Sequence, residues 1–441
     1  MAYIFALISL FSIFFLRKIF SKHYFTPTGF LSAVWIMFIG LKLLFVRDYY
    51  YSFHASFLFV LFIGVFFLGE LAMFFYLLFQ NKNSESVANN NLKTNTDLEI
   101  FNRKSTIKKF NFLMFFLGLL SFIGSIIYIY LFAAYFGSIT NVLTAGWAAR
   151  GALEEISIPL FVRAILLLGY SAIVLSLVYQ MIYDKFKWYF LLPYLSMFIT
   201  GVTQAGRAGF MMIIFQVFIA IYWREITKQL KGNKNNKFLI SPDFKLIKST
   251  AKLIFFISII FIGGDMLRSQ DSSFNSEIIN QGLITFKAYL FGGIAGFTSY
   301  LRDYQLPGLN DLGWGRYSFS SLFDLLGIQK NTLGIYTNYL RKSDTDSMGI
   351  NIFTAFRQFI DDFGILGTTF FMFLMGSISH VFFRQSIKGN FSAIAFMIVF
   401  YSFLVHTPFL TITVHNSILI SAILPLFVLK FVKKKIIFFL T

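Results

Sequence analysis

The chain contains no cysteine in its 441 residues. Disulfide bonds, thiolate nucleophiles and cysteine-ligated metal sites are therefore excluded. Charged residues are also scarce, because Asp, Glu, Lys and Arg make up only 13% of the sequence, whereas about 25% is usual for soluble domains. A chain with so few charges cannot cover the surface of an ordinary soluble protein.

Apolar side chains occupy most of the sequence. Hydrophobic residues make up 57% of it, and 62 of them are Phe. Apolar runs recur along the whole chain, and a run of about 18 residues or more can cross a hydrocarbon core of about 30 Å as a helix. The sequence therefore predicts an all-α polytopic membrane protein, with residues 1–441 forming a single integral membrane domain in the lipid bilayer.

Eleven transmembrane helices are predicted, at residues 2–16, 28–46, 53–80, 110–136, 159–183, 188–203, 207–223, 251–266, 363–383, 391–408 and 413–430. The polar stretch 81–109 is predicted to be a cytoplasmic linker, and 264–360 to be a large extracytoplasmic loop with interfacial helices. Within that loop, residues 281–299 carry Lys287 and, in their second half, Gly292, Gly293 and Gly296. We therefore expect an interfacial or re-entrant helix there and not a further span.

The distribution of positive charge predicts the orientation. With the N-terminus outside, the inner segments carry 25 of the 38 Lys and Arg residues, as the positive-inside rule requires. An odd number of spans then places the C-terminus inside. The net charge of +18 is thereby attributed to membrane topology, and no nucleic-acid partner is predicted.

Lysine and arginine are divided unequally between the two sides. The predicted inner segments hold 21 Lys and 4 Arg, whereas the predicted outer segments hold 9 Arg and 3 Lys. A guanidinium matches phosphate and carboxylate groups through paired hydrogen bonds. The outer arginines are therefore expected around a phosphate-bearing lipid head group, unless each pairs with a nearby carboxylate. They are Arg47, Arg150, Arg163, Arg207, Arg268, Arg302, Arg316, Arg341 and Arg357.

The stretch TQAGRAGF, residues 203–210, joins two predicted spans at the outer side. Its glycines leave room for a ligand to approach the backbone, and Arg207 begins a helix, where backbone N–H groups favour an anion. The functional interpretation makes Arg207 an anion contact. The alternative is an arginine that only marks the end of a span.

The stretch NIFTAFRQFIDDFG, residues 351–364, places three charges beside a predicted span. As a helix it has one apolar stripe, and Arg357 and Asp361 are in i,i+4 contact. We expect a helix in the outer interface, with its polar face toward water, that bends into the next span near residues 362–367. Arg357 would contact an anion, and Asp361 or Asp362 would accept a proton. The alternative is a self-satisfied Arg–Asp pair.

Three further ionisable residues are candidates for chemistry. His406 and His415 flank a short predicted outer turn, and histidine is the commonest general acid or base. The alternative for each is a histidine that is hydrogen-bonded at a helix end. Glu70 lies inside the third predicted span, where carboxylates are functional candidates by default, but the sequence offers it no evident partner.

These features make the chain resemble the Wzy-type oligosaccharide repeat-unit polymerases, which build O-antigen and capsular polysaccharide in bacteria. The resemblance rests on the number of spans, GRAGF (206–210), the late outer loop and NIFTAFRQFIDDFGILG (351–367). It implies the C-type membrane glycosyltransferase fold and a place in the bacterial cytoplasmic (inner) membrane. It also implies transfer of a growing glycan from polyprenyl pyrophosphate to an incoming polyprenyl-pyrophosphate-linked oligosaccharide.

The resemblance assigns roles to the candidate residues. Arg207 and Arg357 would contact the pyrophosphate, with Arg302, Arg316 and Arg341 as further substrate-binding residues. The base would be Asp361, Asp362, His406 or His415. No metal and no cofactor is expected, and a chain-length regulator and a flippase are the expected protein partners.

Three other functions remain open at this point. An O-antigen ligase would use the same chemistry with another acceptor, and a non-catalytic partner would only bind sugar. A transporter or flippase of lipid-linked oligosaccharides usually shows internal repeats and paired charges at the bilayer midplane. This chain instead concentrates its polar groups in one outer insertion, which favours surface chemistry.

Overall fold

The computed structural model describes most of the chain, with gaps in several loops. The described residues are 1–20, 26–85, 100–101, 103–145, 148, 151–152, 155–203, 208–232, 276–303, 306–328, 336, 339–345, 349–409 and 412–434. Arg207 and the predicted span 251–266 lie outside them, as does most of the predicted linker 81–109.

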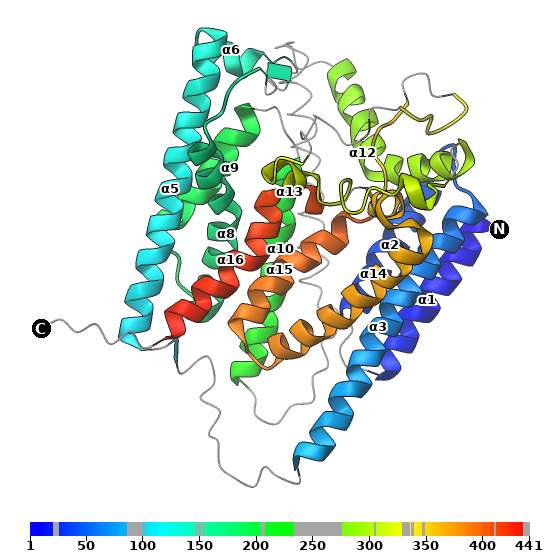
Figure 1. Ribbon diagram of the computed structural model, residues 1–441, viewed down its shortest axis with the longest axis horizontal. Coiled ribbons are helices and arrows are strands. Elements are labelled where there is room, and N and C mark those ends of the chain that lie inside the picture. Colours follow the sequence, from blue (N-terminus) through cyan, green and yellow to red (C-terminus); the bar gives the residue numbers. More distant parts are fainter. Residues whose placement is uncertain are drawn as a thin grey trace, which may run out of the picture. The chain divides into compact units, whose positions relative to one another are not determined.

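Helices account for nearly all of the regular structure in the described residues (Figure 1). The strand-type pairing seen there is an isolated antiparallel bridge between Leu340 and Ile350. The helices are α1 (Ala2–Phe20), α2 (Pro27–Phe45), α3 (Phe53–Glu85), α5 (Lys104–Phe136), α6 (Ile139–Thr144), α8 (Leu160–Tyr183), η2 (Trp188–Phe190), α9 (Leu191–Thr203), α10 (Ala208–Gly232), α12 (Ser276–Asp303), η3 (Leu309–Asp311), α13 (Ser320–Leu325), α14 (Ala355–Ile387), α15 (Phe391–His406), η4 (Ile412–Val414) and α16 (Asn416–Lys433).

Six of the described helices are long and apolar enough to cross a membrane, namely α2, α3, α5, α8, α14 and α16. Shorter apolar helices cover Ala2–Arg17, Trp188–Thr203 and Phe391–His406. The protein is therefore a helical multi-pass membrane protein. Eleven spans stays a prediction. Helix α12 is not among the six, as the glycines and Lys287 of residues 281–299 led us to expect.

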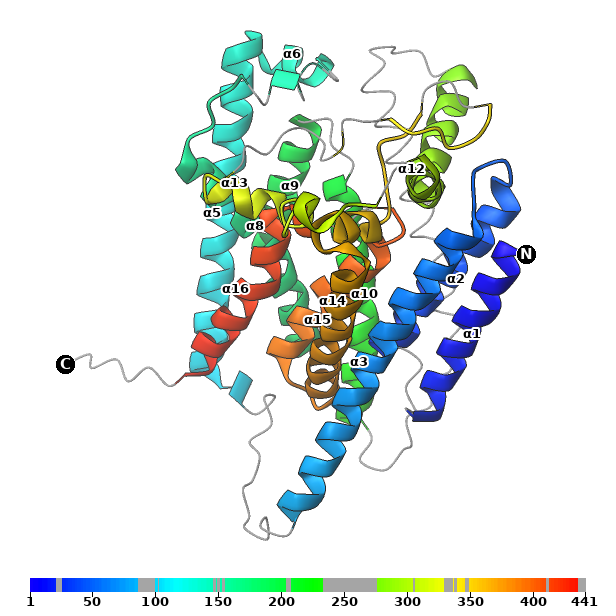
Figure 2. The same ribbon diagram turned by 45° about the vertical axis from the view of Figure 1, so that its right-hand side comes forward.

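The chain divides into two compact units. The first comprises Met1–Ala88, Asn236–Val381 and Tyr401–Asn416, and the second comprises Asn89–Asn235, Phe382–Phe400 and Ser417–Thr441. In the first unit, α1, α2 and α3 pack against one another and lie side by side in both views (Figure 1; Figure 2). The same unit contains the insertion and the first part of α14, and with them nearly all of the predicted site.

Helices α3 and α14 approach each other at backbone distance within the first unit. A methyl group on Gly69 would overlap the carbonyl oxygen of Phe373, and one on Gly376 would overlap the carbonyl oxygen of Phe66. The hydroxyl of Ser377 donates to the carbonyl oxygen of Gly69 at 3.0 Å. Small residues allow such close helix contacts in membranes, so this crossing fixes α14 against α3.

Helix α14 contains a break at Gly364, whose φ of 65° and ψ of −179° are not helical. A positive φ is readily adopted by glycine alone, so the bend predicted near residues 362–367 is confirmed. The expectation that the polar face before the bend points to water is wrong. Thr354, Arg357 and Gln358 are all buried, because residues of the insertion cover this face.

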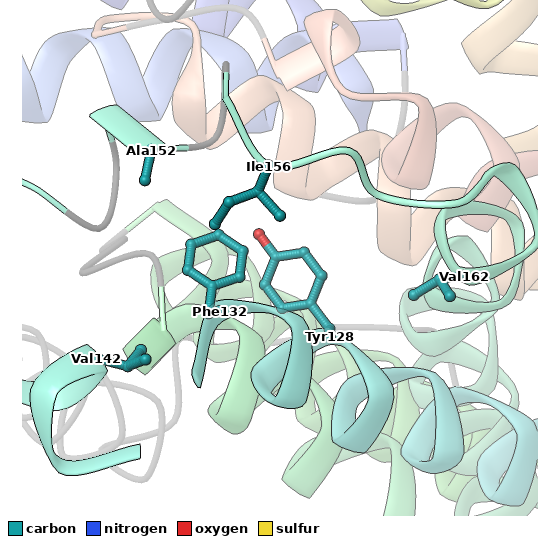
Figure 3. Close-up of a cluster of buried hydrophobic side chains, with 6 residues drawn as sticks. All are labelled: Tyr128, Phe132, Val142, Ala152, Ile156 and Val162. Atoms are coloured by element: carbon teal, nitrogen blue, oxygen red, sulfur yellow. The ribbon is translucent and has the colours of Figure 1, made fainter. Parts of the chain in front are cut away.

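The second unit has its own apolar core. Helix α5 packs against α8 and α9, and the hydroxyl of Ser121 on α5 donates to the hydroxyl of Ser196 on α9 at 2.7 Å. Figure 3 shows a buried cluster at one end of this unit, in which rings from α5 meet side chains of α6, α8 and the segment between them. The cluster is Tyr128, Phe132, Val142, Ala152, Ile156 and Val162. These contacts account for the packing of the unit.

The predicted topology can be tested by cysteine labelling, which is clean because the native chain has no cysteine. Leu309 in η3 is 83% exposed, and Lys388 is an exposed residue between α14 and α15. We expect Leu309→Cys to react with an impermeant maleimide in intact cells, and Lys388→Cys to react only after permeabilisation. Labelling of both residues from the same side would contradict the crossing of α14.

Candidate functional site

Arg357, on the first turns of α14, lies inside a cage of aromatic rings. Its guanidinium carbon is 3.7 Å from the ring centre of Tyr336, 3.8 Å from that of Phe353 and 4.5 Å from that of Tyr300. A cation over a ring face is attracted by the ring's quadrupole, by about 2 kcal/mol when water is excluded. The side chain is only 5% exposed, so the charge is held in a largely dry environment.

Asp361 gathers the groups that surround Arg357. One carboxylate oxygen accepts from the Tyr300 hydroxyl at 2.6 Å, and the other accepts from the Tyr336 hydroxyl at 2.6 Å. The Nε atom of Arg357 lies 3.4 Å from the second of these oxygens. Burial, and then the Asp361 carboxylate, raise the pKa of both tyrosines. The phenols therefore stay protonated and act as hydrogen-bond donors. The i,i+4 pair predicted from the sequence is confirmed.

Asp362 is fully buried and holds a loop of the insertion. Its two carboxylate oxygens accept from the backbone N–H groups of Tyr317 at 3.0 Å and Ser318 at 2.6 Å. The backbone carbonyls of Asp361 and Asp362 accept from the N–H groups of Gly313 and Trp314, at 2.9 and 3.0 Å. The turn 313–318 is thus attached to α14 directly before the break at Gly364.

The last turn of α12 organises the neighbouring arginines. The hydroxyl of Ser299 donates to the carbonyl oxygen of Arg341 at 2.7 Å. Arg302 forms an exposed pair with Asp303, with Nε to Oδ1 at 2.6 Å, and its guanidinium lies 4.3 Å from the ring centre of Tyr50. Arg302 therefore contacts the segment around Tyr50, and the backbone of Arg341 is bonded to α12.

The two histidines have different surroundings. His406, at the end of α15, is buried, and its Nδ1 lies 2.6 Å from the carbonyl oxygen of Ser402. This is the hydrogen bond at a helix end that we considered as the alternative. The following residue, Thr407, accepts from the backbone N–H of Ala355 at 2.9 Å, which brings this turn to the start of α14. His415 is exposed.

The structure therefore brings together Arg357, Asp361 and Asp362, with Arg316 on the attached turn. Arg302 and Arg341 lie at the last turn of α12, and Arg207 lies outside the described residues. Sequence reasoning did not identify Tyr300 and Tyr336 as partners of Asp361. They lie 61 and 25 positions away in the chain, and no local spacing relates them.

A second buried cluster, formed by Arg17, Thr28, Glu70 and His380, lies in the same unit and is called the Glu70 cluster below. One oxygen of Glu70 accepts from Arg17 Nε at 2.8 Å and Nη2 at 2.5 Å, and lies 3.4 Å from Nδ1 of His380. The other oxygen accepts from the backbone N–H of Thr28 at 2.9 Å and from its hydroxyl. All four side chains are nearly or fully buried.

The Glu70 cluster corrects the interpretation of two residues. Glu70 has partners from α1, α2 and α14, whereas the sequence offered it no evident partner. Arg17, which we counted among the inner positive charges, is one of these buried partners. His380 follows Gly364 on α14 by 16 residues, about 24 Å along a helix. The two buried clusters therefore lie near opposite ends of the α14 segment that follows its break.

The described residues contain no group of three or more His, Cys, Asp or Glu side chains that could hold a metal ion. No protein-family profile matches the chain, and no curated protein or solved structure is significantly similar to it.

We expect Glu70→Gln to lower the free energy of unfolding by about 3–5 kcal/mol, because it leaves the buried Arg17 charge without its counterion. The measurement is thermal or denaturant unfolding of the purified protein in detergent. Asp303→Asn breaks an exposed pair and serves as the control, with an expected loss of about 1 kcal/mol or less. Equal effects of the two changes would show that the Glu70 cluster is not buried as described.

Tyr336→Phe should destabilise the protein by about 1.5–3 kcal/mol, because it removes a hydrogen bond to a charged carboxylate and keeps the ring over Arg357. Tyr317→Phe is the matched control, since its ring stacks on Tyr336 and its hydroxyl is not one of the two that donate to Asp361. In an Asp361→Asn background the Tyr336→Phe change should cost much less. Full additivity of the two changes would contradict this contact.

Proposed function

We propose that this protein is a membrane glycosyltransferase that joins polyprenyl-pyrophosphate-linked oligosaccharide repeat units into O-antigen or capsular polysaccharide. The reaction would take place at the outer face of the bacterial cytoplasmic membrane. The observation that carries the proposal is the buried cation of Arg357, oriented by Asp361 and three aromatic rings at the end of a membrane helix. The resemblance of residues 206–210 and 351–367 to Wzy-type polymerases supports the same assignment.

The chemistry requires a positive charge that is in position before the reaction. The bond between the sugar's anomeric carbon and the pyrophosphate oxygen breaks, and a bond from the acceptor hydroxyl to that carbon forms. The lipid pyrophosphate leaves with added negative charge, and the hydroxyl proton passes to a base. A fixed guanidinium in a dry site stabilises such developing charge without reorganisation, and Arg357 meets this requirement.

The candidate bases differ in their surroundings. Both oxygens of Asp362 accept backbone N–H groups, so we assign it the task of holding the turn 313–318. Asp361 is 14% exposed on its side chain and lies beside Arg357. His415 is exposed on the segment that receives the same turn, because the hydroxyl of Thr413 donates to the carbonyl oxygen of Ser318. Both oxygens of Asp361 already accept hydrogen bonds, from Tyr300 and Tyr336, so His415 is the base that we favour.

The Glu70 cluster favours one second candidate, a transporter or flippase of the same lipid-linked sugars. Ionisable groups buried in membrane segments commonly mark ion or substrate pathways, and Arg17, Glu70 and His380 are such groups. Deletion of the gene distinguishes the two functions. A polymerase defect leaves single repeat units on the outer side and removes the polymer ladder, whereas a flippase defect leaves units that still face the cytoplasm.

Arg357→Lys should reduce polymer formation by a factor of roughly 10 to 100, because lysine keeps the charge and loses the planar fork, worth about 1.5–3 kcal/mol. Arg207→Lys is expected to act alike. The control is Arg47→Lys, an exposed residue whose Nε donates to the carbonyl oxygen of Leu43. Polymer length is compared in membranes that contain equal amounts of folded protein.

A normal ladder from Arg357→Lys and Arg207→Lys would contradict the pyrophosphate assignment of these arginines. A loss of polymer that disappears once the amount of folded Arg357→Lys protein is matched to the wild type would also count against a direct role. The purified variant is therefore compared with the wild type by thermal unfolding before rates are interpreted.

A further inference from the structure

The turn Gly313–Arg316 holds a tryptophan in an uncommon backbone conformation. Trp314 has a φ of 52° and the following Gly315 a φ of 97°. A bulky side chain adopts positive φ only when its surroundings hold it there, and such residues concentrate at binding and catalytic sites. Trp314 is one of two non-glycine residues with positive φ in the described part of the chain.

Hydrogen bonds and steric contacts fix this turn from several sides. The N–H groups of Gly313 and Trp314 donate to the carbonyls of Asp361 and Asp362. A methyl group at Gly313 would meet the ring of Tyr317 at 2.6 Å, so position 313 requires glycine. The buried carboxylate of Asp362 accepts the next N–H groups along the chain. The backbone of the turn is therefore rigid.

The rigid turn nevertheless leaves its largest side chain in the open. Trp314 is 67% exposed, and Arg316, two positions later, is exposed as well. The ring of Tyr317 stacks on Tyr336 with an interplanar angle of 8°, and Tyr336 covers Arg357. Trp314 and Arg316 thus lie on the same turn that connects, through Tyr317, to the cage around Arg357.

An exposed indole ring and an exposed guanidinium on the same turn suit a carbohydrate. The flat ring packs against the C–H face of a sugar, and the guanidinium donates to hydroxyl or phosphate oxygens. Tryptophan is also common at membrane interfaces, where no particular backbone conformation is needed. Trp188 is a suitable comparison, since it is equally exposed at 66% and lies on η2 with an ordinary backbone. A Trp314 backbone that is fixed before binding lowers the entropy cost of binding, and this raises the affinity only for a ligand that fits the fixed conformation.

We propose that the Gly313–Arg316 turn is a saccharide-binding subsite, in which Trp314 stacks on a sugar ring and Arg316 binds the sugar's oxygens. Asp362 positions the subsite. The inference rests on the proposed function in one respect, because it takes the saccharide to be part of the lipid-linked substrate. It adds to that function the place where the sugar, as distinct from the pyrophosphate, is recognised.

The test measures binding of a saccharide that lacks both lipid and pyrophosphate. The probe is the radiolabelled oligosaccharide released by mild acid from lipid-linked repeat units of the producing cells, and the full-length protein is held in nanodiscs. We expect saturable binding that weakens by about tenfold or more in Trp314→Ala. Trp314→Tyr should recover part of the loss, and Asp362→Asn should weaken binding although the indole is intact. Trp188→Ala is the matched control and should bind like the wild type.

Equal binding by Trp314→Ala and Trp188→Ala would overturn the inference, as would absence of saturable binding by the wild type. Quenching of Trp314 fluorescence by brominated lipid, undiminished by the probe, would also overturn it and make Trp314 an interface anchor. A different result would contradict the proposed function alone. If the probe binds through Trp314 but gene deletion leaves the polymer ladder, the saccharide site stands and the polymerase assignment falls.

Discussion

The ion pair between Arg357 and Asp361 is the contact on which the surrounding structure depends. An isolated charge in such a dry environment would cost many kcal/mol, so each residue requires the other. The pair also needs partners from other segments. The carboxylate oxygens of Asp361 accept hydrogen bonds from Tyr300 and Tyr336, and aromatic rings cover the faces of the Arg357 guanidinium. Helix α12, the segment around Tyr336 and the start of α14 meet here because the buried charges need partners from all of them.

Helix α14 connects this pair to a second set of buried charges. The Glu70 cluster takes His380 from α14 and joins it to α1, α2 and α3. Beside it, the close backbone approaches at Gly69 and at Gly376 bring α3 and α14 together. A helix fixed at both ends by charge pairs that are costly to break resists bending except at Gly364. Rigid support of this kind is what a preorganised catalytic charge requires.

Features that depend on local pattern could be predicted from the sequence. Apolar runs located the six described helices that are long and apolar enough to cross a membrane. The i,i+4 spacing identified the contact of Arg357 with Asp361, and the bend lies at Gly364, within the predicted residues 362–367. Burial of the polar face of residues 354–358 was missed, since it depends on an insertion whose contacts lie far away in the chain. The partners of Glu70 were missed for the same reason: Arg17 and His380 are 53 and 310 positions from it. No periodicity encodes such distances.

The most direct test of the account is a reaction with purified components. The full-length protein is reconstituted into vesicles that contain polyprenyl-pyrophosphate-linked repeat units as the only saccharide, and the glycan products are sized over time. The account predicts glycans longer than one repeat unit, together with release of polyprenyl pyrophosphate. Repeat units that stay single while they move from one leaflet to the other would contradict it.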